Sequence, residues 1–124
     1  MKKKIKKVNT AILIIGNEIL SGRTQDKNIA FLSNWLNSKC GISVNEVRII
    51  PDDQKTIIDT ILSLSKKFKS VFTTGGIGPT HDDITAQSIS KAFKVKYEFH
   101  KEAYAILEKY YGKKKFNDGI RKLA

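Results

Sequence analysis

The 124-residue sequence contains one cysteine, Cys40, and no long apolar segment. A single cysteine cannot form a disulfide within the chain, so we expect a reducing compartment, the cytoplasm. The longest apolar run covers residues 11–15 and is far shorter than the roughly 20 residues of a transmembrane helix. It is also too short for the apolar part of a signal peptide. The sequence shows no internal repeat and no linker, and it predicts no membrane partner.

The formal net charge of +11 comes from the two ends of the chain. Residues 1–7 contain five lysines, and residues 113–122 contain five basic residues against Asp118. The intervening residues 8–112 carry 13 basic and 11 acidic side chains and are almost neutral. Basic ends are most often solvated, so we do not expect nucleic acid as the partner. We predict a basic tail at residues 1–8 and one domain at residues 9–124.

Short apolar runs alternate with helical patterns along the chain. The predicted strands are residues 10–15, 44–50 and 71–74. The first of them is continuously apolar, as a strand buried on both faces requires. Helical spacing of apolar residues follows at residues 28–39 and 57–68, and a third helix is predicted through about Phe93. This order predicts an α/β fold, with a mostly parallel sheet and helices on both faces.

Boundary signals accompany these elements. Gly41 is placed to end the first helix, and Asp52 or Asp53 to begin the second. Thr80 and Asp83 fit a capping box at the start of the third helix.

Beyond Phe93 the pattern is weaker. Val95, Tyr97 and Phe99 alternate with charged residues, as in a short edge strand. A last helix is predicted around residues 103–110, with Gly112 at its end.

The segment at residues 73–85 has the most specific composition. Gly75, Gly76 and Gly78 leave backbone N–H groups uncovered, which allows an anionic group to approach closely. Asp82 and Asp83 then place negative charge beside this anion site, which indicates a divalent metal ion or an activated water. The loop lacks the last glycine of a dinucleotide-binding motif. A tight turn before a capped helix is the alternative interpretation.

Two further polar loops follow the other predicted strands. Residues 16–28 contain Glu18 and Asp26, which could bind ribose hydroxyls or a metal, although Asp26 could instead cap the next helix. This loop does not fit the phosphate-binding P-loop spacing. Asp52 and Asp53 form the other loop, where an acid before a helix is an ordinary start signal. Because ligands bind beyond the carboxyl ends of parallel strands, we expect all three loops to meet at one edge.

The three loops together resemble the molybdopterin-binding (MoaB/Mog-like) domain family, in the branch found at the N-terminus of competence/damage-inducible protein A (CinA). The first loop fits the pattern G-[DN]-E-[IL]-L-x-G-x-x-x-D-x-N throughout residues 16–28. Residues 75–85 fit G-G-[LI]-G-P-T-x-D-D-[LI]-T residue for residue. The resemblance implies a three-layer α/β/α sandwich that is usually oligomeric. It also implies that this chain is truncated, because the family domain continues beyond a segment similar to residues 121–124.

The resemblance implies a phosphorylated small molecule as ligand, either molybdopterin or a nucleotide pyrophosphate such as ADP-ribose or FAD. It places the functional carboxylates at Asp52 and Asp83, and a divalent metal such as Mg²⁺ is predicted at Asp82 and Asp83. The other predicted ligand contacts are Gly16, Glu18, Gly22, Asp26, Asn28, Thr74, Gly75, Gly76, Gly78, Pro79 and Thr80. Our leading hypothesis is metal-dependent hydrolysis of a nucleotide pyrophosphate. A module that binds molybdopterin or a nucleotide without turnover is the alternative.

Overall fold

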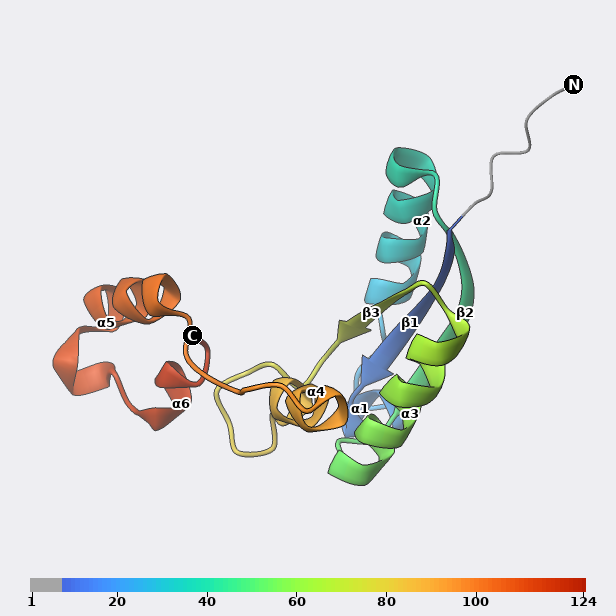
Figure 1. Cartoon of the computed structure of the whole chain (residues 1–124). Helices are drawn as coiled ribbons and strands as arrows, with labels where there is room; N and C mark the ends of the chain where they lie inside the picture. Colours follow the sequence, from blue (N-terminus) through green and yellow to red (C-terminus); the bar gives the residue numbers. More distant parts are fainter. Residues whose placement is uncertain (1–7) are drawn as a thin grey trace, which may run out of the picture.

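The computed structural model describes residues 8–124, so most of the predicted basic tail lies outside the described residues. Strands and helices alternate as far as α4 and are followed by two more helices (Figure 1). The elements are β1 (Asn9–Ile15), α1 (Asn17–Leu20), α2 (Asn28–Cys40), β2 (Ser43–Ile50), α3 (Gln54–Lys67), β3 (Ser70–Thr74), α4 (Thr85–Phe93), α5 (Lys101–Lys115) and α6 (Asp118–Arg121).

The three strands form one parallel sheet with the order β2-β1-β3. β1 is the central strand, and its Leu13 is in register with Arg48 on β2 and Thr73 on β3. Residues 11–15 of β1 are buried on both faces of the sheet. The continuous apolar run therefore has the position that its composition predicts.

Helices cover both faces of the sheet, which confirms the three-layer α/β/α architecture. α2 lies against one face, whereas α3 and α4 lie on the other (Figure 1). The main core forms between β1 and α3, where Leu13, Ile57 and Leu64 are fully buried. Neighbouring residues of a strand point to opposite faces, so Ile12 and Ile14 face the α2 layer.

Local signals explain where several of these elements begin and end. Gly41 ends α2 in the left-handed conformation, at a φ of 65°, and its N–H donates to the Leu36 carbonyl. Asp53 begins α3, because its carboxylate accepts hydrogen bonds from the Thr56 N–H at 2.9 Å and the Thr56 hydroxyl at 2.7 Å. Both predicted boundaries are confirmed.

Two predictions about the C-terminal half are wrong. No capping box starts α4, because the helix begins only at Thr85 and Asp83 bonds Thr80 within the preceding loop. Residues 95–99 do not form an edge strand, because none of the described strands lies beside them. Gly112 was expected to end the last predicted helix, and its non-helical backbone angles, a φ of 71° and a ψ of 162°, do interrupt α5 there, before a further turn to Lys115.

The last two helices lie to one side of the sheet and share a small aromatic cluster (Figure 1). Tyr104 packs edge-to-face against Phe99 and Phe116, at ring distances of 5.2 and 4.9 Å. Arg121 of α6 lies over the Phe116 ring at 5.0 Å. Along residues 8–124, no helix combines the length and apolar character needed to cross a membrane.

The turn after β3 passes very close to the end of β1. Gly75 has a φ of 90°, and a Cβ atom there would lie 2.0 Å from the backbone oxygen of Ile15. Only glycine fits this position, because any side chain would push the loop away from the strand. The backbone of the glycine loop is therefore fixed against the sheet.

Truncation of a core side chain should reveal how much α3 contributes. We expect Ile57→Ala to lower the free energy of unfolding by about 2–5 kcal/mol, because Ile57 is fully buried. The same change at Ile106, which is 68% exposed on α5, is the matched control and should cost far less. Urea denaturation of both variants checks this, and equal losses would contradict the assigned core.

The close approach at Gly75 can be tested against a second glycine with positive φ. Gly22 has a φ of 79° and open space around it, so Gly22→Ala should cost only the backbone strain, about 1–2 kcal/mol. We expect Gly75→Ala to cost roughly 1–3 kcal/mol more, since the new methyl group meets the Ile15 carbonyl. Urea midpoints that shift equally in the two variants would contradict this contact.

Candidate functional site

The three polar loops meet at the carboxyl edge of the sheet, as predicted. The Gly16 N–H, directly after β1, donates to the Ile50 carbonyl at the end of β2, at 3.0 Å. The glycine loop after β3 lies against Ile15 from the other side. The ends of three neighbouring strands thus bring three separate sequence segments together.

Asp52 is held by Asn17 through two reciprocal hydrogen bonds. The Asn17 N–H donates to Asp52 Oδ2, and the Asp52 N–H donates to Asn17 Oδ1, each at 3.1 Å. The other carboxylate oxygen, Oδ1, would lie 3.5 Å from a Cβ atom at Gly76. Asp52 is therefore oriented by the first loop and lies next to the third.

The glycine loop has no room for side chains at Gly76, which lies against Thr85, and at Gly78, which lies against Asp83. A Cβ atom at Gly76 would lie 2.2 Å from Thr85 Oγ1, and one at Gly78 would lie 2.7 Å from Asp83 Oδ2. The Thr85 hydroxyl donates to the Gly75 carbonyl at 2.8 Å, and the Thr85 N–H donates to the Gly76 carbonyl at 3.1 Å. The first turn of α4 thereby holds the loop in place.

Asp83 is fixed by the turn that precedes it. Its Oδ2 accepts hydrogen bonds from the Thr80 N–H at 3.0 Å and the Thr80 hydroxyl at 2.8 Å. The hydrogen bond from the Thr80 hydroxyl is the largest cause that lowers the pKa of this carboxyl. The N–H groups of Thr80 and Gly78 and the charge of Lys122 also lower this pKa, whereas burial raises it. Asp83 is therefore a charged carboxylate directly beside the glycine loop.

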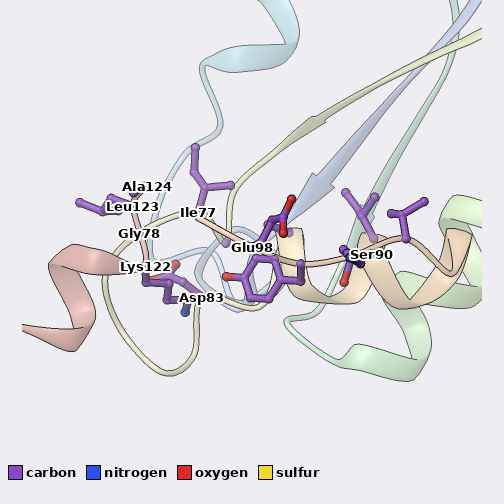
Figure 2. Close-up of a pocket in the computed structure, with 14 residues that line it drawn as sticks. Ile77, Gly78, Asp83, Ser90, Glu98, Lys122, Leu123 and Ala124 are labelled. Carbon is purple, nitrogen blue, oxygen red and sulfur yellow. The ribbon is translucent and has the colours of Figure 1, made fainter. Parts of the chain in front are cut away.

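A hollow of about 520 Å³ lies between the glycine loop, α4 and the C-terminal residues. Figure 2 shows Asp83 beside Lys122 at its wall, close to Gly78. Asp52 is not among its lining residues, although its Oδ1 would lie 3.5 Å from a Cβ atom at Gly76, which does line it. The two predicted catalytic carboxylates therefore lie beside the same loop at positions two residues apart, Asp52 at Gly76 and Asp83 at Gly78.

The other predicted acidic residues have local partners. Asp26 accepts a hydrogen bond from the Ile29 N–H at 2.8 Å and so caps the first turn of α2, which supports its alternative role. The Glu18 carboxylate folds back over Gly16. Asp82 has an 80% exposed side chain and pairs with His81 at 3.2 Å. Neither Asp26 nor Asp82 contacts the glycine loop through these bonds.

The remaining predicted ligand contacts follow the edge of the sheet. Asn28 is the first residue of α2, and Thr74 is the last residue of β3. Pro79 lies against the α6 region, because its carbonyl oxygen would be 2.5 Å from a Cβ atom at Gly119. Gly22 has open space around it. Their contacts with a ligand stay predictions.

Sequence reasoning missed two residues of the site. One is Asn17, which orients Asp52 through two hydrogen bonds. Asn17 belongs to the first-loop motif of residues 16–28, but it was not among the predicted site residues. Lys122 was assigned to a solvated basic end, yet its ammonium group donates to the Thr80 carbonyl. The similarity of residues 121–124 to a family segment was the available signal for Lys122.

Comparison with known proteins supports this interpretation of the loops. The family described as a probable molybdopterin binding domain matches residues 11–121. A protein of Archaeoglobus fulgidus is 38% identical over 91% of this chain and 48% of its own length. A probable FAD synthase of Caenorhabditis elegans is 37% identical over 89% of this chain and 22% of its own length. The chain thus spans about half the length of these curated relatives, or less.

Solved structures agree with the fold. The protein CinA of Thermoplasma acidophilum, described as having unknown function, has a TM-score of 0.84 and 30% identity. The match covers 94% of this chain and 68% of that protein. The tungsten cofactor synthesizing protein MoaB of Pyrococcus furiosus shares the fold, with a TM-score of 0.63 and 23% identity. That match covers 86% of this chain and 66% of the MoaB chain. On the family match and the CinA structure, this chain belongs to the molybdopterin-binding (MoaB/Mog-like) domain family and is similar to the CinA structure.

Proposed function

We propose that the chain binds a phosphorylated nucleotide at the glycine loop and hydrolyses its pyrophosphate bond with the help of a divalent metal ion. The observation that carries this proposal is the position of two fixed carboxylates, Asp52 and Asp83, beside one glycine loop. Bare amides attract a phosphate, and the carboxylates supply the negative oxygens that a metal ion and an attacking water need.

The residues at the loop have separate parts in this proposal. Glycine-loop N–H groups hold one phosphate, and Lys122 adds a positive charge at the wall of the hollow. Asp52 or Asp83 orients the attacking water. Water then bonds to one phosphorus atom, the bridging P–O bond breaks, and two phosphate monoesters leave.

The donor set fits a hard cation such as Mg²⁺. Asp52 and Asp83 offer carboxylate oxygens, and Asp52 Oδ1 accepts no hydrogen bond from residues 8–124. Along these residues no group of three or more acidic, histidine or cysteine side chains is gathered. Mg²⁺ is commonly bound by one or two carboxylates together with substrate phosphates, so a smaller donor set suits it. The metal would neutralise charge that develops on the phosphate oxygens.

The names of similar proteins support a phosphorylated ligand. The printed name of the nematode relative includes FAD, and the family description names molybdopterin. ADP-ribose and FAD share a pyrophosphate, the group that the glycine loop and Lys122 suit. We also propose a cytoplasmic location, because the single cysteine, Cys40, is exposed and has no partner for a disulfide within the chain.

Binding without turnover is the second candidate function. It is favoured by the position of Asp52, which lies outside the hollow that contains Asp83. If a single ligand cannot reach both carboxylates, the loop holds a molybdopterin or nucleotide phosphate and no bond breaks. Binding that a chelator leaves unchanged, with no product formed, would support this function.

Removal of either carboxylate tests hydrolysis. With ADP-ribose and Mg²⁺, we expect Asp83→Asn and Asp52→Asn to lower the rate of phosphate-ester release by about 10²–10⁴-fold. Asp59→Asn is the matched control, since Asp59 is 65% exposed on α3 and pairs with Lys55 on the same helix. Chelation of the metal should abolish the release. Rates equal to wild type in Asp83→Asn would remove Asp83 from the mechanism.

The lowered pKa of Asp83 predicts a pH-dependent stability. The Thr80 hydroxyl lowers this pKa below the ordinary 3.8, so the charged carboxylate stabilises the folded chain above that pH. This contribution is lost as the pH falls through the folded-state pKa. We therefore expect Asp83→Asn to be less stable than wild type at pH 7, with a difference in urea midpoint that narrows as the pH falls below 3.8.

Two variants of Thr80 act as controls for this pH dependence. Thr80→Val removes the hydroxyl donor and should reduce the loss of stability on acidification, whereas Thr80→Ser keeps the donor and should behave as wild type. A difference between wild type and Asp83→Asn that stays constant down to pH 2 would contradict the lowered pKa.

A further inference from the structure

Thr85, the first residue of α4, lies directly against the glycine loop and is buried, with 2% of its surface exposed. Its hydroxyl donates to the Gly75 carbonyl at 2.8 Å, and its N–H donates to the Gly76 carbonyl at 3.1 Å. One residue therefore binds two successive carbonyl groups of the loop. Thr85 was not among the predicted site residues.

These two hydrogen bonds decide which way the loop presents its peptide groups. A trans peptide is planar, and its N–H points in the opposite direction to its carbonyl. The Gly75 carbonyl shares a peptide with the Gly76 N–H, and the Gly76 carbonyl shares one with the Ile77 N–H. Because both carbonyls point toward Thr85, both N–H groups point away from it. Gly76 and Ile77 also line the hollow that contains Asp83, and Figure 2 shows Ile77 at its wall.

This direction matters for the binding of an anion. Successive N–H groups on one side of a loop attract a phosphate, whereas carbonyl oxygens turned to the same side would repel it. Gly75 and Gly76 both have positive φ, and glycine has no side chain that restricts the rotation of its peptide groups. The Thr85 hydroxyl thus supplies a constraint on the loop that the glycines themselves lack.

The hydroxyl and the loop are closely matched in shape. A Cβ atom at Gly76 would lie 2.2 Å from Thr85 Oγ1, so the hydroxyl occupies the space that a side chain would need. The same Cβ position is 3.5 Å from Asp52 Oδ1. The part of the loop that Thr85 orients is therefore also the part beside the Asp52 carboxylate.

We propose that Thr85 is a positioning residue for the ligand phosphate. It binds the Gly75 and Gly76 carbonyls from one side, and the N–H groups of Gly76 and Ile77 are thereby presented to the phosphate on the other. Thr85 touches no ligand itself and acts only through these two peptides. The inference rests on the proposed binding of a phosphorylated nucleotide at the glycine loop, but it does not require hydrolysis.

Two variants that differ by one oxygen atom, Thr85→Ser and Thr85→Ala, test this role. AMP is the probe, because it carries a phosphate but no pyrophosphate bond, and adenosine is the reference without phosphate. In calorimetric titrations with and without Mg²⁺, the wild type should bind AMP more tightly than adenosine. We expect Thr85→Ala to lower the AMP affinity about tenfold and to leave the adenosine affinity unchanged. Thr85→Ser keeps the donor and should bind AMP as the wild type does.

Ser88→Ala is the matched control on the same helix. The Ser88 hydroxyl is also buried, but it donates to the Ile84 carbonyl within α4, at 2.7 Å. Its loss should leave the preference for AMP over adenosine unchanged. A preference that falls equally in Ser88→Ala and Thr85→Ala would show a general effect on α4 and would overturn the proposal.

Other results would also overturn it. These are a Thr85→Ala variant that binds AMP as tightly as the wild type, an equal loss of AMP and adenosine affinity, and a wild type that binds AMP no more tightly than adenosine. Urea denaturation identifies a variant that does not fold, and Thr85→Val, which keeps the volume without the donor, then repeats the comparison. If the AMP results hold but ADP-ribose is not cleaved, the proposed hydrolysis is contradicted and the role of Thr85 is not.

Discussion

The structure depends on the close passage of the glycine loop over the carboxyl end of the central strand. At Gly75 the loop comes so near the Ile15 carbonyl that no side chain fits between them. On the other side of β1, Gly16 is bonded to the end of β2. Backbone packing alone thus brings three loops to one edge. The position of every candidate ligand contact on those loops follows from these two contacts.

The carboxylates of Asp52 and Asp83 are each held by one neighbouring residue. The two neighbours differ in how the fold brings them there. Asn17 belongs to another loop and reaches Asp52 only because β1 and β2 are adjacent in the sheet. Thr80 belongs to the same turn as Asp83 and keeps its carboxylate charged. Both acids are therefore oriented by the chain itself. Such preorganised charge is what phosphoryl transfer requires, since little reorganisation is then left for the reaction.

Much of the fold was predictable because its signals are local. The apolar run of β1, the glycine that ends α2 and the aspartate that begins α3 each act within a few residues. The errors came from features that depend on distant parts of the chain. Residues 95–99 have a strand pattern but no strand beside them, and Lys122 reaches Thr80 from 42 residues away. The spacing of Thr80 and Asp83 predicted a capping box at the start of α4. The same spacing also fits a separate turn before the helix, and the structure has that turn.

The strand order has a consequence for how the chain is made. Of the three described strands, β1 leaves the ribosome first, and both strands that pair with it come later, beginning at Ser43 and Ser70. Until then the apolar residues 11–15 have no neighbour on either edge. Nascent chains with an unpaired hydrophobic strand are prone to aggregate, and pairings between distant segments form slowly. The central strand of the sheet is therefore also the strand that stays unpaired for the longest time during synthesis.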